Sequence, residues 1–221
     1  MSSSIVPNTY FFDFSFCSPK VKKQIRIDGD LSDWDSSYLV PDLMHLIGQK
    51  PFADVYFSWD DDNIYIGLSI NKITPVDVDP IRFWTKDCIE LWFDLRNEKP
   101  VRRYTEHCHH FYLLPQGRKT DIQLATAGEC REPGSAIPET IHDHEEIEIA
   151  SIVEQNTYSL EACIPRSVIP TFDPVNYPLI GFNYHINSTD RKAQWWSCGT
   201  DLPRHVDPST WGTIELVETL T

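Results

Sequence analysis

One short segment, RFWTKDCIELWFD at residues 82–94, combines carboxylates with large aromatic rings. A sugar has a rather apolar ring face, which packs on a flat aromatic side chain, and a rim of hydroxyls, which needs rigid hydrogen-bond partners. Because residues two apart on a strand share a face, Glu90, Trp92 and Asp94 are predicted to point together, opposite an apolar face that belongs to the core. With Trp84 as an aromatic lip, the segment indicates a sugar-binding site. The alternative is ordinary packing of both tryptophans beside solvated carboxylates.

Catalysis is the less favoured chemistry for these carboxylates. Glycoside hydrolysis needs two carboxyl groups on opposite sides of a bond, whereas Glu90 and Asp94, four apart on one strand, would share one side. Glu161, on a separate predicted strand, is the remaining candidate for an opposing group. The sequence contains no glycine-rich phosphate loop and no nucleophile elbow. We therefore expect no catalytic constellation, with glycoside processing as the enzymatic alternative.

Histidines form the densest cluster of transition-metal ligand types, in the segment HCHH at 107–110. Alternate residues of a strand face opposite sides, so at most two of these four side chains could reach one ion. A zinc or copper site would need His142 or His144 folded across. Histidines at a sheet edge, without a metal, are the alternative.

Length and charge narrow the class of partner. The chain has 221 residues, enough for one sizeable domain, and no linker-like stretch divides it. Its 19 Lys and Arg against 33 Asp and Glu give a formal net charge of −14, which disfavours nucleic acid and anionic membranes because both are polyanions. No stretch is long and apolar enough to insert into a membrane as a spanning segment. We expect a neutral carbohydrate as partner, with a protein partner as the alternative.

The N-terminus and the cysteines favour a cytoplasmic location. The first 20 residues lack the basic start and continuous apolar run of a signal peptide, since Asp13 interrupts their apolar patch. The six cysteines show no disulfide-framework spacing, and Cys88 and Cys163 fall within predicted strands. We therefore expect reduced cysteines and a single domain over residues 1–221, with residues 1–20 as an N-terminal extension packed on it.

Short alternating patterns with turn signals between them predict an all-β fold. The clearest hairpin joins 54–59 and 64–70 through the acidic turn 60–63. Helical signal is limited to one turn at 165–169, and 128–144 is predicted to be a long exposed loop. The predicted fold is an antiparallel β-sandwich with little helix. Further strands are predicted at 88–94, 110–114, 121–125, 145–153, 157–164, 179–187, 194–198 and 212–217.

Six segments, taken in order, resemble the family 9 carbohydrate-binding modules and the related sandwich domains of the DOMON type. They span nearly the whole chain, and their succession carries the resemblance rather than any single motif. The segments are IDGDLSDW at 27–34, VYFSWDDDNIYIGLSI at 55–70, FWTKDCIELWFD at 83–94, YSLEACIP at 158–165, IGFNYHINSTD at 180–190 and DPSTWGTIEL at 207–216. The resemblance implies a jelly-roll-like sandwich that binds the end of a glycan between two tryptophans, without catalysis of its own.

The resemblance also implies particular ligand residues. Trp84 falls where the family has its first sandwiching tryptophan, and Glu90 falls where it has a sugar-contacting glutamate. His205 stands in the place of the second tryptophan, so Trp195 or Trp196 would have to form the opposing wall. The family's arginine on the strand after the glutamate strand is missing. A second hypothesis follows from these departures: a scaffold or interaction protein that kept the sandwich and lost the sugar site.

Two strand residues, Tyr112 and Asn183, complete the predicted ligand-binding set. Asn183 alternates with His185 and Asn187 on one strand face, where amide and imidazole groups suit hydroxyls. A solvated sheet face is the alternative for these three residues.

Members of the resembled family often bind structural calcium. Two acidic turns of this chain offer the hard oxygen ligands that calcium prefers, and their candidate ligands are Asp28, Asp30, Asp60 and Asp62. Some DOMON-type domains bind haem through Met and His, but Met44 is the only internal methionine here. We expect no other cofactor.

Overall fold

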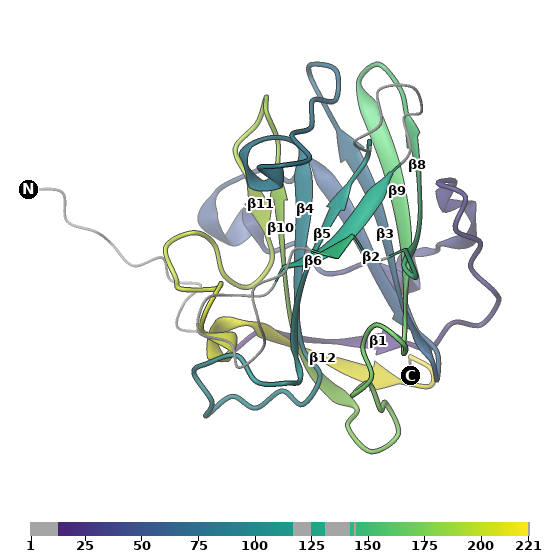
Figure 1. Ribbon diagram of the computed structural model, residues 1–221, viewed down its shortest axis with the longest axis vertical. Helices are drawn as coiled ribbons and strands as arrows, with labels where there is room; N and C mark the ends of the chain where they lie inside the picture. The colour runs from purple at the N-terminus through teal and green to yellow at the C-terminus, as the bar shows by residue number, and fades with distance from the viewer. Residues whose placement is uncertain (1–12, 117–124, 131–141, 144, 221) are drawn as a thin grey trace, which may run out of the picture.

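The computed structural model describes residues 13–116, 125–130, 142–143 and 145–220. Within these ranges the chain forms two β-sheets that face each other (Figure 1). Helical structure in the described residues is limited to short 3-10 turns. The predicted β-sandwich with little helix is therefore confirmed. The 3-10 turns are η2 (Leu31–Asp33), η3 (Ser36–Tyr38), η4 (Met44–Ile47), η5 (Phe83–Thr85) and η6 (Pro208–Thr210).

The larger sheet has the strand order β1-β12-β10-β4-β5-β6-β7, with β11 paired to the end of β10. Its neighbouring strands are antiparallel except for β1 and β12, which run parallel. The strands of this sheet are β1 (Ser15–Pro19), β4 (Cys88–Asp94), β5 (Cys108–Leu114), β6 (Thr126–Cys130), β7 (His142–Asp143), β10 (Leu179–Asn187), β11 (Gln194–Trp195) and β12 (Gly212–Val217).

The smaller sheet is fully antiparallel, in the order β2-β3-β9-β8. Its strands are β2 (Ala53–Trp59), β3 (Asn63–Asn71), β8 (Glu148–Val153) and β9 (Thr157–Pro165). The predicted hairpin is confirmed, because β2 and β3 pair throughout. In its turn, one Asp60 oxygen accepts hydrogen bonds from the backbone N–H groups of Asp62 and Asn63, as an Asx turn requires.

The core fills the space between the two sheets. Alternate residues of each central strand point inward, so β3 contributes one apolar face and β4 the other. Aromatic contacts cross the gap, with Phe57 of the smaller sheet against Phe182 and Phe93 of the larger. Each fully buried side chain of this kind stabilises the fold by about 1.5–3 kcal/mol. The inward residues of β3 and β4 are Ile64, Ile66, Leu68, Ile70, Ile89, Leu91 and Phe93.

Strand boundaries predicted from alternation are largely confirmed. The strands at 88–94, 179–187 and 212–217 have the predicted ends. The strand predicted at 110–114 begins at Cys108, that at 145–153 begins at Glu148, and that at 157–164 extends to Pro165. A hydrogen-bonded turn follows where one turn of helix was predicted, since the backbone N–H of Ile169 donates to the carbonyl of Pro165.

Two predictions need correction, and a third falls almost wholly outside the described residues. The exposed loop predicted over 128–144 is wrong at both ends, because β6 reaches Cys130 and β7 holds 142–143. The strand predicted at 121–125 lies almost wholly outside the described residues. Within the predicted N-terminal extension, Ser15–Pro19 is an edge strand of the larger sheet rather than a segment packed on it, while residues 1–12 lie outside the description.

No helix among the described residues has the length and apolar character needed to cross a membrane.

Candidate functional site

The predicted site lies on the outer face of the larger sheet, opposite the core. Strand register places His185 of β10, Glu90 of β4 and Tyr112 of β5 side by side in one row. The next row along the strands holds Asn183, Trp92 and His110. This face is covered, because Glu90 is only 2% exposed. The alternative of a solvated sheet face is therefore wrong for Asn183 and His185, which are both buried, whereas Asn187 is half-buried.

Trp84 stands at the rim of this face on a support of stacked rings. Its ring meets Phe83 edge to face, with centroids 5.0 Å apart. Phe83 in turn stacks on Tyr112, with centroids 4.3 Å apart and planes within 11° of each other. Tyr112 lies across its register partner Gly128, where any Cβ would come within 2.4 Å of the phenol ring. The Trp84 side chain is 51% exposed, so the alternative that it is a buried packing residue is excluded.

Glu90 lies at the centre of the covered face with both oxygens engaged. Oε2 is 3.1 Å from Nε2 of His110, and Oε1 accepts a hydrogen bond from the side-chain amide of Asn187. Nδ1 of His185 is 3.7 Å from the same Oε1. Burial alone would raise the pKa of Glu90, but the hydrogen bond with His110 and the neighbouring histidine charges outweigh it and lower this pKa to about 2.

His185 is buried, and its ring nitrogens make no hydrogen bond with the described residues. Desolvation and the positive charge of Arg204 lower the pKa of His185 to about 4, so the ring is neutral at pH 7. Neither of its ring nitrogens has a hydrogen-bond partner among the described residues. A buried polar side chain left in this state carries a desolvation cost of about 1–3 kcal/mol.

Trp92 lies fully buried in the row next to Glu90, between Asn183 and His110. It stacks on His110 with ring centroids 4.4 Å apart and planes 21° apart, and His205 meets its edge at 5.3 Å. The guanidinium of Arg204 lies over the same indole, 5.3 Å from the ring centroid. Arg204 therefore brings a guanidinium to this face, although the strand position where the resemblance implies an arginine lacks one.

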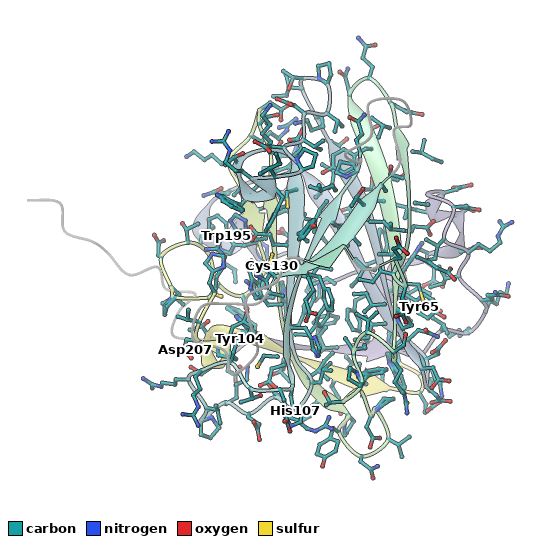
Figure 2. All side chains as sticks on the ribbon, in the orientation of Figure 1. Tyr65, Tyr104, His107, Cys130, Trp195 and Asp207 are labelled. Carbon is teal, nitrogen blue, oxygen red and sulfur yellow. The ribbon has the colours of Figure 1, made fainter. Side chains whose placement is uncertain are left out.

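The two candidates for the opposing wall, Trp195 and Trp196, lie on different sides of the sheet. Trp195 pairs in register with His185 and stacks on its ring, with centroids 6.2 Å apart; it is half-buried, and Figure 2 shows it beyond the outer face of the larger sheet. Trp196 lies in the core, edge-on to Phe16 at 5.2 Å. Trp195 is therefore the one of the pair that a ligand on the outer face could reach.

Asn183 is committed to a structural role within the fold. Its amide nitrogen donates to the carbonyl of Cys198 at 3.1 Å, and its oxygen accepts from the backbone N–H of Ser197 at 3.0 Å. These bonds hold the loop after β11 against the sheet.

The acidic turns use several of their carboxylate oxygens in hydrogen bonds and ion pairs of their own. Asp28 and Asp30 accept hydrogen bonds from backbone N–H groups two residues further along the chain. Asp60 accepts from its own turn and from the Tyr65 hydroxyl, and Asp62 lies 3.3 Å from Arg166. Calcium takes six to eight oxygen ligands, and its binding at these turns stays a prediction.

Glu161, the proposed opposing carboxylate, lies on the outer face of the other sheet. Its oxygens accept hydrogen bonds from the indole of Trp34 and from the backbone N–H of Gly29. Tyr65 marks the same outer side of the smaller sheet in Figure 2. Glu161 and Glu90 are therefore separated by both sheets and cannot flank one glycosidic bond.

The histidine segment divides between the two faces of β5. His109 points to the core side, where its Nδ1 is 2.7 Å from Glu129, and His110 points to Glu90. His110 also meets His205 there: one ligand atom each from Glu90, His110 and His205 lie within 4.8 Å of one another. The resemblance placed Glu90 and His205 at the predicted ligand site, but sequence reasoning missed that both meet His110. The three side chains come from separate segments of the chain, and their meeting depends on tertiary contacts.

Comparison with known proteins places this arrangement in a wider context. A family model described as "Carbohydrate family 9 binding domain-like" matches residues 33–219. No functionally curated protein matches the sequence. Among solved structures, a family 9 carbohydrate-binding module of Caldicellulosiruptor kristjanssonii in complex with cellotriose aligns with a TM-score of 0.65 at 16% identity, covering 94% of this chain and 95% of that one. The same organism's family 9 module in complex with glucose aligns with a TM-score of 0.63 at 16% identity, covering 94% and 97%. These two likenesses show the fold.

Proposed function

This chain belongs to the carbohydrate family 9 binding domain-like family, and from that premise we propose that it is a noncatalytic β-sandwich that binds a sugar or the end of a glycan. The observation that carries the proposal is the half-exposed indole of Trp84, held on a stack of buried rings six residues before Glu90. The structural neighbours bind glucose and cellotriose, which makes a neutral glucose-based sugar the first class to test.

The support under Trp84 matters because it orders the ring before any ligand arrives. Phe83 is buried and fixes the edge of the indole, and Tyr112 fixes Phe83 in turn. A rigid aromatic surface gives contact area with little loss of side-chain entropy on binding. Trp84 would therefore take the apolar face of a pyranose.

Polar groups for the hydroxyls lie further along the same face. In the proposed complex the sugar rim points towards Glu90, whose Oε1 now accepts from the Asn187 amide and could accept from a hydroxyl in its place. Trp195 contributes the second ring from the β10 side, and Arg204 offers N–H donors next to Trp92. A chain with a net charge of −14 suits a neutral ligand of this kind.

Calorimetric titration of glucose and cello-oligosaccharides tests the proposal. The parent chain is expected to bind, and Trp84→Ala to bind about 30-fold more weakly, which corresponds to about 2 kcal/mol for a central aromatic contact. Tyr177→Ala is the matched control, because Tyr177 is also an exposed aromatic but precedes β10, at the end of the sheet opposite to Trp84. Equal affinities for the parent and Trp84→Ala, or no binding across a broad sugar set, would overturn it.

The scaffold hypothesis remains the second candidate, and one observation favours it. Glu90 is almost fully buried and both of its oxygens already have partners. If that closure is permanent, the face cannot admit a sugar rim. Absence of sugar binding together with recovery of a stoichiometric protein partner by cross-linking would support the scaffold; a saturable sugar titration lost in Trp84→Ala would exclude it.

A further inference from the structure

Three side chains of metal-ligating type meet under the loop that covers the larger sheet: Glu90, His110 and His205. Their ligand atoms all lie within 4.8 Å of one another. Glu90 and His110 are nearly inaccessible to solvent, and His205 is half-buried. The group thus combines two imidazoles and one carboxylate, a donor set that suits zinc and neighbouring divalent transition metals.

Glu90 and His110 are held on neighbouring strands, β4 and β5. His110 is the register partner of Trp92, so its ring lies diagonally across from Glu90 on the same face. The stack between His110 and Trp92 fixes the orientation of the imidazole. His205 arrives from the loop before η6 and rests against the edge of the same indole.

A fourth buried group faces the same carboxylate. His185 lies directly opposite Glu90 in register, and its Nδ1 is 3.7 Å from Glu90 Oε1. The side chain is 2% exposed, and neither ring nitrogen has a hydrogen-bond partner in the described part of the chain. Native structures rarely leave such a group without a reason.

We propose that Glu90, His110 and His205 bind one divalent transition-metal ion of the zinc type, with His185 closing on Oε1 of Glu90, the oxygen that does not face His110. An imidazole that donates to a ligating carboxylate orients it, as partners outside the coordination sphere commonly do. The fourth position on the ion remains open to water or to a hydroxyl of a ligand. Calcium and magnesium are excluded as the preferred ion because they take oxygen ligands.

The three ligand atoms need to move little to bind one ion. Donor atoms on a tetrahedral zinc ion are about 3.3–3.6 Å apart when each is about 2.0–2.2 Å from the metal. Glu90 and His110 already lie at 3.1 Å, so the remaining approach falls to His205, which is carried by a loop. Arg204 brings a positive charge to the same face, over Trp92, and the Glu90 carboxylate supplies a negative charge there.

Metal binding by the full chain tests the proposal directly. After treatment with a chelator and dialysis, the protein is expected to bind one Zn²⁺ per chain by calorimetry, and Co²⁺ to give the visible spectrum of a tetrahedral site with imidazole ligands. Removing one ligand in His110→Gln or His205→Gln is expected to weaken Zn²⁺ binding by about 100-fold or more, beyond the 10–100-fold typical of supporting residues.

Two control variants separate a site from nonspecific histidine binding. His45→Gln removes an exposed histidine of η4, and His109→Gln breaks another buried histidine–carboxylate pair on the same strand. Both are expected to keep the Zn²⁺ affinity of the parent. Substoichiometric binding, an unchanged affinity in His205→Gln, or equal losses in His45→Gln would overturn the proposal.

The metal-binding test still gives an answer if His110→Gln, which alters a strand, fails to fold. His205 lies on a loop, so His205→Gln and the cobalt spectrum of the parent chain give the answer without substituting a strand residue. Sugar titrations with and without Zn²⁺ keep the two proposals apart, because loss of Trp84-dependent sugar binding bears only on the proposed carbohydrate function.

Discussion

Phe83 stacks on Tyr112 with ring centroids 4.3 Å apart and an angle of 11° between the planes. This pair connects the exposed Trp84 to the row that contains Glu90, because Trp84 packs on Phe83 and Tyr112 is the register partner of Glu90. The proposed sugar platform is therefore part of the packed structure of the larger sheet and not an isolated loop ring.

Removing the middle ring should uncouple the platform from the sheet. Phe83→Ala is expected to lower the free energy of unfolding by about 3–5 kcal/mol, as for other buried Phe→Ala changes, and to weaken sugar binding because Trp84 loses its support. Urea unfolding and calorimetric titration measure the two effects. Phe172→Ala, a buried phenylalanine that follows β9, should cost similar stability and leave sugar affinity unchanged; a matching loss of affinity there would contradict the coupling.

Gly128 is required by the ring of Tyr112. A Cβ at position 128 would lie 2.4 Å from the phenol carbon that bears the hydroxyl, so Gly128→Ala must displace the ring or the strand. We expect a loss of about 1–3 kcal/mol in unfolding free energy, in the range of other overpacked sites. In a Tyr112→Ala background the same change should cost much less, and a double-mutant cycle in urea measures the difference. Additive costs would show that the clash is relieved elsewhere.

Alternation along single strands predicted much of this fold, because each strand has one core face. The segment 88–94 shows why: Ile89, Leu91 and Phe93 repeat at every second position, and the residues between them, which include Glu90 and Asp94, face the other side of the sheet. The strand Ser15–Pro19 was missed because its sequence, SFCSP, has weak alternation and it forms only by parallel pairing with β12, near the other end of the chain.

The site was less predictable than the strands. The face of Glu90 follows from alternation, but its burial depends on loops that cross the sheet from far along the chain, such as the one Asn183 holds through Ser197. Trp195 and Trp196 could not be distinguished from the sequence because β11 is only two residues long. The meeting of Glu90 with His205 depends on tertiary contacts alone.

Acid should destabilise the fold partly through Asp190. Burial would raise the pKa of this carboxyl, but backbone hydrogen bonds from Thr74 and Ile73 and a hydroxyl bond from Ser188 lower it far below its usual value. A carboxyl with a depressed pKa in the folded state contributes stability above its unfolded pKa, near 3.9, and loses it as pH falls. Between about pH 5 and pH 3, the parent should therefore lose more unfolding free energy than Asp190→Asn, whose side chain does not titrate. Urea unfolding across this range checks the sign, and parallel pH profiles would refute the assignment.

The Lys72–Asp87 and Lys86–Asp77 ion pairs share a nitrogen–oxygen distance of 2.7 Å but differ in burial. The Lys72 and Asp87 side chains are 1% and 0% exposed, whereas those of Lys86 and Asp77 lie at the surface. Lys72→Met is expected to cost about 3–5 kcal/mol, because it leaves the Asp87 carboxylate buried without its cation.

Lys86→Met should cost at most about 1 kcal/mol, since water solvates the carboxylate it leaves behind. Chemical unfolding of both variants compares the stability lost at the buried and the exposed ion pair, whose nitrogen–oxygen distances are equal. Added salt should reduce the small effect at Lys86 and leave the effect at Lys72 nearly unchanged, because buried charges are screened much less than exposed ones. Similar costs for the two variants would mean that Asp87 is stabilised without Lys72, through the backbone N–H groups of Asp77 and Thr189 that donate to it.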